Sequence, residues 1–297
     1  MSLVKMQIEF ANKRRVFVEK LLIVDGSNLL FQMFYGIPSR ITGLRGQPVQ
    51  GTLGFLGALL KILRMVQPSH ALVVFDGECE SARRDLDPDY KANRPDYREV
   101  PEEDTPFSQL PDLFRVLDYL RIPWKETTNC EADDWIAGYA RAYGKDREIV
   151  IVSQDSDFFQ LITDRVRVLR YRGKQSILCG PEEIRQKLGI APEQYAAYKS
   201  LTGDTADNIR GAEKIGPKTA AALMSLFGNL DALLEGWQEI PKPSVRESVR
   251  KNAYRIRKNY ALICLEGSGE LPFAWEELKT TIPNVATMQV LHSLEIL

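Results

Sequence analysis

Three short apolar runs along the chain each lead into an aspartate. The segments are Leu21-Leu22-Ile23-Val24-Asp25, Ala71-Leu72-Val73-Val74-Phe75-Asp76 and Ile149-Val150-Ile151-Val152-Ser153-Gln154-Asp155. Runs that are this short, rich in β-branched residues and apolar on both faces predict strands buried in a parallel sheet. Helical patterns lie between them, notably over 53–66 and 110–120. The alternation predicts an α/β fold, with a mostly parallel central sheet flanked by helices.

The pattern changes after Gly180. Four helical patterns follow, over 181–188, 192–201, 217–227 and about 245–262. We therefore expect an α/β core over 21–180 and a helical subdomain over 181–297. Residues 1–20 precede the first predicted strand and are interpreted as an N-terminal extension.

Composition narrows the class of protein. The chain has 297 residues, of which 44% are hydrophobic and 27% charged, as in ordinary soluble domains. It contains neither an apolar run of about 18 residues nor a signal-peptide stretch, and its four cysteines have no paired spacing. We expect a cytoplasmic monomer with no membrane association. Two histidines leave little room for a serine–histidine triad or a histidine-bound zinc, so catalysis must use carboxylates, lysines, arginines or tyrosines.

Acidic residues follow the predicted strands and recur in three further motifs. Ligands gather at the carboxyl ends of parallel strands, so Asp25, Asp76 and Asp155 are expected to converge. One such aspartate alone is typical of a turn or a helix cap, and acids in a helix's first turn complement its dipole. The complete set is larger than either explanation requires. Its nine members are Asp25, Asp76, Glu131, Asp133, Asp134, Asp155, Asp157, Asp204 and Asp207.

These nine acids account for the near-neutral net charge of −1. The rest of the chain has 31 acidic and 39 basic residues, which gives a formal charge of +8. A positively charged remainder of this kind would suit binding of a polyanion. Two carboxylates about 4 Å apart repel by about 4 kcal/mol at an effective dielectric constant of 20, so the cluster requires cations. Oxygen ligands without histidine favour Mg²⁺ or Mn²⁺ over zinc. Two such ions are suited to phosphodiester hydrolysis.

Five motifs resemble the bacterial and phage 5′ nuclease family, which comprises flap endonucleases and the 5′–3′ exonuclease domain of DNA polymerase I. The matching stretches are Ile23-Val24-Asp25-Gly26, Phe75-Asp76-Gly77, Glu131-Ala132-Asp133-Asp134, 153–161 and 203–209. The resemblance runs from about Leu21 to Leu265 and does not include a polymerase domain, so we expect either a stand-alone nuclease or a fragment cut at the boundary of that domain. It implies a PIN-like core that uses two metal ions to cleave DNA at a 5′ flap or at a 5′ end beside a duplex junction.

Residues 81–105 resemble the helical arch of that family, through which the 5′ strand passes. On a helix, Lys91 and Arg94 are i and i+3 and share one face, and Tyr90 offers a stacking surface for an unpaired base. The resemblance implies that Lys91 and Arg94 assist catalysis at the scissile phosphate, and that Arg83 and Tyr90 also contact DNA. Without that resemblance, a solvated basic helix is the simpler interpretation. Asp85, Asp87, Pro88 and Asp89 weaken its basicity and helicity.

Residues 200–228 resemble the helix–hairpin–helix element of the family. Gly216-Pro217 is typical of a turn into a helix with proline at its first position. Backbone N–H groups there, together with Lys218, Thr219 and the nearby Lys214, suit a phosphate of duplex DNA. In the family this element often holds K⁺ on backbone carbonyls. The basic helix near 245–262 either extends this duplex contact or is a solvated face.

The sequence as a whole predicts a structure-specific 5′ nuclease that acts on DNA in replication or repair. Two alternatives stay open at this point. One is a metal-dependent ribonuclease of related fold, against which the arch and the hairpin argue. The other is a non-catalytic protein that binds DNA junctions, against which the complete acid set argues.

Overall fold

A six-stranded sheet lies at the centre of the protein. The computed structural model describes residues 19–77, 82–267 and 270–297, so most of the expected N-terminal extension lies outside the described residues. The strands are β1 (Lys20–Asp25), β2 (His70–Phe75), β3 (Trp124–Glu126), β4 (Glu148–Val152), β5 (Val166–Arg170) and β6 (Ile177–Cys179). Their spatial order is β3-β2-β1-β4-β5-β6, and every neighbouring pair is parallel except β5 and β6. The predicted α/β fold is confirmed.

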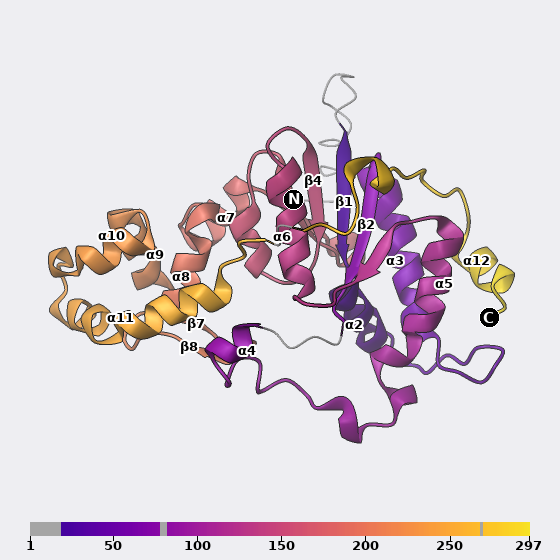
Figure 1. Cartoon of the computed structure of the whole chain (residues 1–297), viewed down its shortest axis with the longest axis horizontal. Helices are drawn as coiled ribbons and strands as arrows, with labels where there is room; N and C mark the ends of the chain where they lie inside the picture. Colours follow the sequence, from indigo (N-terminus) through magenta and orange to yellow (C-terminus); the bar gives the residue numbers. More distant parts are fainter. Residues whose placement is uncertain (1–18, 78–81, 268–269) are drawn as a thin grey trace.

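Helices cover both faces of this sheet (Figure 1). They are α2 (Gly26–Gly36), α3 (Gln50–Val66), α5 (Leu110–Leu120) and α6 (Ala132–Tyr143). Successive side chains of a strand point to opposite faces. Leu21 and Ile23 of β1 accordingly join the apolar cluster that contains α6, whereas Leu22 and Val24 join the cluster with α2, α3 and α5. Burial on both sides explains why the runs 21–24, 71–75 and 149–152 of β1, β2 and β4 are apolar.

Helix α2 begins directly where β1 ends. Asp25 is its N-cap, and the Asp25 side chain accepts a hydrogen bond from the Asn28 backbone N–H. The next residue, Gly26, lies against the Phe75 ring, and a Cβ atom at this position would approach ring atoms to 2.7 Å. Only glycine allows the chain to turn this tightly beside β2. The turn holds Asp25 at the edge of the sheet.

A helical region follows the sheet in the chain (Figure 1, left). Its elements are α7 (Pro181–Leu188), η6 (Pro192–Gln194), α8 (Tyr195–Thr202), β7 (Gly203–Asp204), β8 (Ile209–Arg210), α9 (Pro217–Phe227), α10 (Leu230–Glu235), η7 (Trp237–Glu239) and α11 (Pro243–Ile263). Strands β7 and β8 form a short antiparallel ribbon between α8 and α9. No helix among the described residues is long and apolar enough to cross a membrane.

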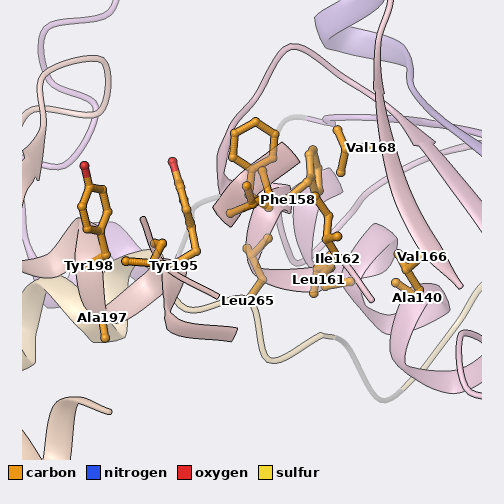
Figure 2. Close-up of a cluster of buried hydrophobic side chains, with 14 of the residues drawn as sticks. Ala140, Phe158, Leu161, Ile162, Val166, Val168, Tyr195, Ala197, Tyr198 and Leu265 are labelled. Carbon is orange, nitrogen blue, oxygen red and sulfur yellow. The ribbon is translucent and has the colours of Figure 1, made fainter. Parts of the chain in front are cut away.

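The helical region and the sheet share one apolar core (Figure 2). The 3₁₀ helix η4 (Asp157–Leu161), which follows β4, contributes Phe158 and Phe159 to this core. Tyr195 and Tyr198 of α8 enter it from the helical side, and the rings of Phe159 and Tyr195 pack edge to face with centroids 5.5 Å apart. This packing fixes η4 next to α8, and therefore next to the start of β7.

The C-terminal segment returns to the sheet. It contains η8 (Trp275–Leu278) and α12 (Thr287–Ser293). Trp275 packs on His70 at the start of β2, with ring centroids 4.2 Å apart, and Ile296 is fully buried in the cluster with α3 and α5. The helical patterns predict one subdomain over 181–297, whereas residues 275–297 of the structure pack against the α/β core.

The arch segment contains little helix. Its elements are α4 (Ala82–Leu86), η1 (Tyr97–Glu99) and η2 (Glu102–Asp104), followed outside the segment by η3 (Pro106–Gln109), and residue 81 lies outside the described residues. Most of residues 88–94 form turns, and Lys91 has φ +58°, in the left-handed region. The prediction that Lys91 and Arg94 share one helical face is therefore wrong. Pro88 lacks an N–H, and the neighbouring aspartates are poor helix formers.

We expect the side chain of Asn259 to stabilise the β7–β8 ribbon. Asn259 of α11 donates hydrogen bonds to the carbonyl oxygens of Ser200 (3.0 Å) and Arg210 (2.9 Å) and is 2% exposed. Asn259→Ala removes both hydrogen bonds, leaves the buried Ser200 carbonyl without this partner and should lower the free energy of unfolding by about 1–3 kcal/mol. Urea denaturation measures the change. The control is Asn252→Ala, because Asn252 bonds only within α11; an equal loss in both variants would contradict the assignment.

Candidate active site

Three of the expected acids lie at the carboxyl ends of adjacent parallel strands. Asp25 ends β1, Asp76 follows β2, and Asp155 comes three residues after β4 ends. Strand β1 lies between β2 and β4, so the three positions are neighbours at one edge of the sheet. Asp25 is 5% exposed, whereas Asp76 is open to solvent.

Hydrogen bonds fix the orientation of these carboxylates. Asp25 Oδ1 accepts from the Asn28 backbone N–H (3.0 Å), and Asp25 Oδ2 accepts from Ser153 Oγ (2.8 Å). The same Ser153 hydroxyl accepts from the backbone N–H of Asp155 (2.9 Å), and Asp155 Oδ1 accepts from the backbone N–H of Asp157 (2.8 Å). The loop after β4 is thereby connected to the end of β1.

Helix α6 adds a fourth acid to this edge. The backbone N–H of Ala132, the first residue of α6, donates to Asp76 Oδ1 (2.9 Å), which places the next residue, Asp133, beside the strand ends. Burial and the nearby charges of Asp155, Asp25 and Asp76 raise the pKa of Asp133 well above its ordinary value. Burial, Asp76 and Asp155 likewise raise the pKa of Asp25 to about 7.

We call Asp25, Asp76, Asp133 and Asp155 the first acidic group. Among the described residues, no lysine or arginine forms an ion pair with any of them. Burial is the main cause of the raised pKa values of Asp25 and Asp133, and repulsion by the neighbouring carboxylates adds to it, while the charge of Lys91 partly offsets the increase at Asp133. An all-oxygen donor set of this kind fits a hard divalent cation.

A second acidic group consists of Asp157, Asp204 and Asp207. One carboxylate oxygen of each lies within 4.8 Å of the others, an arrangement that could hold a metal ion. Unlike the first group, these acids form ion pairs with side chains that the structure describes. Lys199 contacts both Asp157 and Asp204, and Arg94 binds Asp207 at 2.9 Å. Burial and Asp155 nevertheless raise the pKa of Asp157 to about 7.

The remaining two acids, Glu131 and Asp134, bind cations of the arch. They form a capping box at the start of α6. Arg83 donates to both carboxylate oxygens of Asp134 (2.7 and 3.1 Å), and Lys91 Nζ lies 2.6 Å from Glu131 Oε2. Glu131 and Asp134 are thus ion-paired, whereas no ion pair joins the first group to a lysine or arginine within 19–77, 82–267 and 270–297.

The arch segment lies against the second acidic group. The Lys91 backbone N–H donates to the Asp207 carbonyl (3.0 Å), and Asn93 Nδ2 donates to the Thr205 carbonyl (2.8 Å). Tyr90 is only 4% exposed, and its hydroxyl lies 3.4 Å from Glu131 Oε2. In this arrangement the Tyr90 ring packs inside the protein, so it is not available for stacking on a base.

The expected phosphate-binding residues lie on the β8–α9 turn. Lys214, Gly216 and Lys218 are exposed, and Gly216 is the N-cap of α9, whose first residue is Pro217. Lys214 has φ +63°, which shapes the turn before the helix. Thr219 is partly exposed on the first turn of α9. In the chain this set follows the β7–β8 ribbon, which carries Asp204 of the second acidic group.

Sequence reasoning missed Lys199 and the hydrogen bonds of Ser153 and Asn28. A signal for Lys199 exists, because it is a lone charge in the otherwise apolar helical pattern of α8. Ser153 and Asn28 belong to motifs that were recognised, but only the fold shows that they orient Asp25.

Comparison with known proteins identifies the class of this fold and site. Residues 20–189 match the family model of the 5′–3′ exonuclease N-terminal, resolvase-like domain. Residues 190–286 match the model of the 5′–3′ exonuclease C-terminal SAM fold. The chain belongs to the 5′–3′ exonuclease family, as the sequence motifs indicated.

Similar proteins occur both alone and as parts of polymerases. The 5′–3′ exonuclease of Aquifex aeolicus is 30% identical over 282 residues, which cover 94% of this chain and 93% of that protein. DNA polymerase I of Rhizobium leguminosarum is 36% identical over 256 residues, covering 83% of this chain and 24% of the polymerase. The chain thus spans about a quarter of the length of this polymerase and of the Thermus aquaticus polymerase, of which it covers 26%.

Solved structures share the fold. Bacteriophage T5 5′-exonuclease with bound divalent metal ions (zinc) has a TM-score of 0.68 at 23% identity, over 82% of this chain and 89% of that one. The catalytic core of Rad2 in complex with a DNA substrate has a TM-score of 0.57 at 18% identity, over 87% and 84%. These similarities confirm the α/β core with its helical C-terminal part.

The raised pKa values predict how stability depends on pH in metal-free protein. Asp25 has a pKa of about 7 in the folded state and about 3.9 in the unfolded chain. Below about pH 3 it is protonated in both states, whereas at higher pH the unfolded state ionises first. The free energy of unfolding should therefore fall by about 2 kcal/mol between pH 5 and pH 8 in chelator.

Urea denaturation at each pH, with chelator and then with Mg²⁺, measures this effect. Mg²⁺ should remove most of the loss, because bound cations favour the ionised carboxylates. Asp25→Asn is the matched variant, and its metal-free stability should vary less with pH. An identical slope for Asp25→Asn and the unmodified protein would show that Asp25 does not carry the effect.

Proposed function

We propose that this chain is a metal-dependent, structure-specific 5′ nuclease that hydrolyses DNA phosphodiesters as a 5′–3′ exonuclease and 5′-flap endonuclease. Its substrates are DNA with a 5′ flap, or a 5′ end at a duplex junction, in replication or repair. We further propose that it acts as a cytoplasmic monomer. The first acidic group carries the proposal, because its four carboxylates lie at the ends of β1, β2 and β4 and at the start of α6 and form no ion pair with a lysine or arginine that the structure describes, an arrangement that fits a divalent ion.

The metal ligands would come from both acidic groups. Asp25, Asp76, Asp133 and Asp155 would hold one Mg²⁺ or Mn²⁺ ion, and the second acidic group would hold the other. Bound ions would supply a water of lowered pKa and neutralise charge on the attacked and leaving oxygens. Ser153 keeps Asp25 oriented towards this position, since its hydroxyl donates to Asp25 Oδ2 at 2.8 Å.

Glu131 and Asp134 have a different role in this proposal. Both are bound to arch cations, at 2.6 Å for Lys91–Glu131 and 2.7 Å for Arg83–Asp134. They hold the arch in register while DNA is absent, and they become available to the metal site when these cations turn to DNA. This assignment keeps all nine acids in the site.

Lys91 and Arg94 would then contact the scissile phosphate. Each already lies at the acidic site, bound to Glu131 and Asp207, respectively. Divalent ions on the carboxylates would weaken these pairs, and a phosphate would provide a replacement partner for each cation. Tyr90 would leave its buried position at the same time and become able to stack on an unpaired base.

Duplex DNA would dock on the turn before α9. The N-terminus of α9 presents backbone N–H groups to a phosphate, and Lys214, Lys218 and Thr219 surround it. Such contacts position DNA without reading its sequence. We propose that K⁺ binds the carbonyl groups of the same turn, with Gly216 allowing close approach of the DNA backbone.

A 5′-flap duplex tests the proposed reaction. The protein should cut it near the flap junction with Mg²⁺ or Mn²⁺ and not with excess chelator. Asp155→Asn should lower the cleavage rate on the order of 100-fold or more, because it removes a charge from the metal site, while flap binding is kept. The readouts are a cleavage gel and fluorescence anisotropy.

Asp164→Asn is the matched control, since Asp164 is exposed outside both acidic groups, and its rate should be unchanged. Cleavage that continues in chelator would exclude the metal mechanism. Cleavage of an RNA flap in preference to DNA would support the ribonuclease alternative instead. Flap binding without any cleavage would support the junction-binding alternative.

The α9 turn generates a second prediction about DNA. Lys218→Ala should weaken duplex binding equally for all sequences and reduce the slope of log K against log salt concentration by about 1, because one phosphate contact is lost. Anisotropy titrations at several salt concentrations measure this slope. Lys174→Ala removes an exposed lysine of η5 (Gly173–Gln175) and should leave the slope unchanged. Equal slopes for all three proteins would contradict the proposed contact.

A further inference from the structure

Lys199 lies inside the second acidic group. It belongs to α8, where every residue from Tyr195 to Leu201 is buried, and its side chain is 10% exposed. Its Nζ contacts Asp157 Oδ1 and Asp204 Oδ2, two of the three carboxylates in the group. Lysine is rarely buried unless it is paired, so the ammonium is held there by these acids.

The two acidic groups therefore differ in charge balance. Among the described residues, the first group has four carboxylates and no ion-paired cation. The second group has three carboxylates and two cations, Lys199 and Arg94. A metal ion at the second group would have to share Asp157 and Asp204 with a positive charge.

The two cations of the second group are not equivalent. Arg94 comes from a turn of the arch, and its side chain is 53% exposed, so it can move away. Lys199 is fixed, because α8 packs in the shared core and Asn259 binds the carbonyl of its neighbour Ser200. Departure of the arch would therefore leave the Lys199 charge in place.

We propose that Lys199 is a fixed cation that lowers the divalent-metal affinity of the second acidic group, so that the two groups bind metal with unequal strength. The first group is the tight site and the second the weak one. This inference rests on the proposed metal-binding function and adds a positioning residue that sets the order of metal loading. Like charges at close range in a buried site repel strongly, so the effect on affinity is large.

Mn²⁺ binding to the full chain without DNA tests the inference. Electron paramagnetic resonance of free Mn²⁺ should show one tight site and one weaker site in the unmodified protein. Lys199→Met keeps the length of the side chain without its charge and should lower the Kd of the weaker site at least ten-fold. Lys187→Met makes the same change in net charge on the exposed surface of α7 and should leave both sites unchanged.

Two further measurements separate this role from a structural one. Adding Asp204→Asn to Lys199→Met should return the second site to weak binding, because a ligand is then lost. In thermal unfolding, Mn²⁺ should raise the Tm of Lys199→Met more than that of the unmodified protein. If Lys199→Met does not fold, Lys199→Gln retains donors for both carboxylates and should show the same tightening of Mn²⁺ binding.

Three outcomes are decisive. Unchanged or weaker Mn²⁺ binding in the folded Lys199 variant overturns the inference, as do two equally tight sites in the unmodified protein. Absence of Mn²⁺ binding at both groups of the unmodified protein would instead overturn the proposed metal-dependent function. Tightening at one site, with Lys187→Met unchanged, supports the role of Lys199.

Discussion

Repulsion between carboxylates at one edge of the sheet is the constraint on which the rest of the site depends. Parallel pairing of β1 with both β2 and β4 leaves no freedom to separate Asp25 from Asp76 or Asp155. The fold therefore confines negative charge, and the hydrogen bonds from Asn28 and Ser153 orient that charge without neutralising it. Packing in the apolar clusters supplies the stability that keeps these groups together.

The protein handles this repulsion in two ways. In the part of the chain that the structure describes, the strand-end carboxylates form no ion pair with a lysine or arginine, which suits exchangeable ions from solution. Elsewhere, lysines and arginines are built in: Lys199 from a buried helix, and Arg83, Lys91 and Arg94 from the arch. The arch cations also attach the arch segment to the core through these ion pairs. The position of the arch without DNA therefore depends on attraction between its cations and the acidic residues.

The sequence was sufficient where a local pattern determines structure directly. Buried β-branched runs located β1, β2 and β4. Because these strands run parallel, Asp25, Asp76 and Asp155 lie at one edge of the sheet. The sequence was insufficient where packing between distant segments determines the position of a side chain or the backbone conformation. Nothing local indicated that Tyr90 would be buried against Glu131, or that Lys91 would adopt a left-handed conformation. Pairing of Lys199 with Asp157 required knowledge that η4 packs on α8, which is a property of the shared core.

The return of the C-terminal segment to the sheet has a mechanical consequence. Since Trp275 packs on His70 and Thr280 N–H binds the Ser69 carbonyl, the helical region is anchored to the core at its exit as well as at its entry. A region attached by a single linker can rotate as a rigid body relative to the core. Attachment at two points restricts this rotation. The position of the turn before α9 relative to the sheet is therefore constrained from both ends of the helical region.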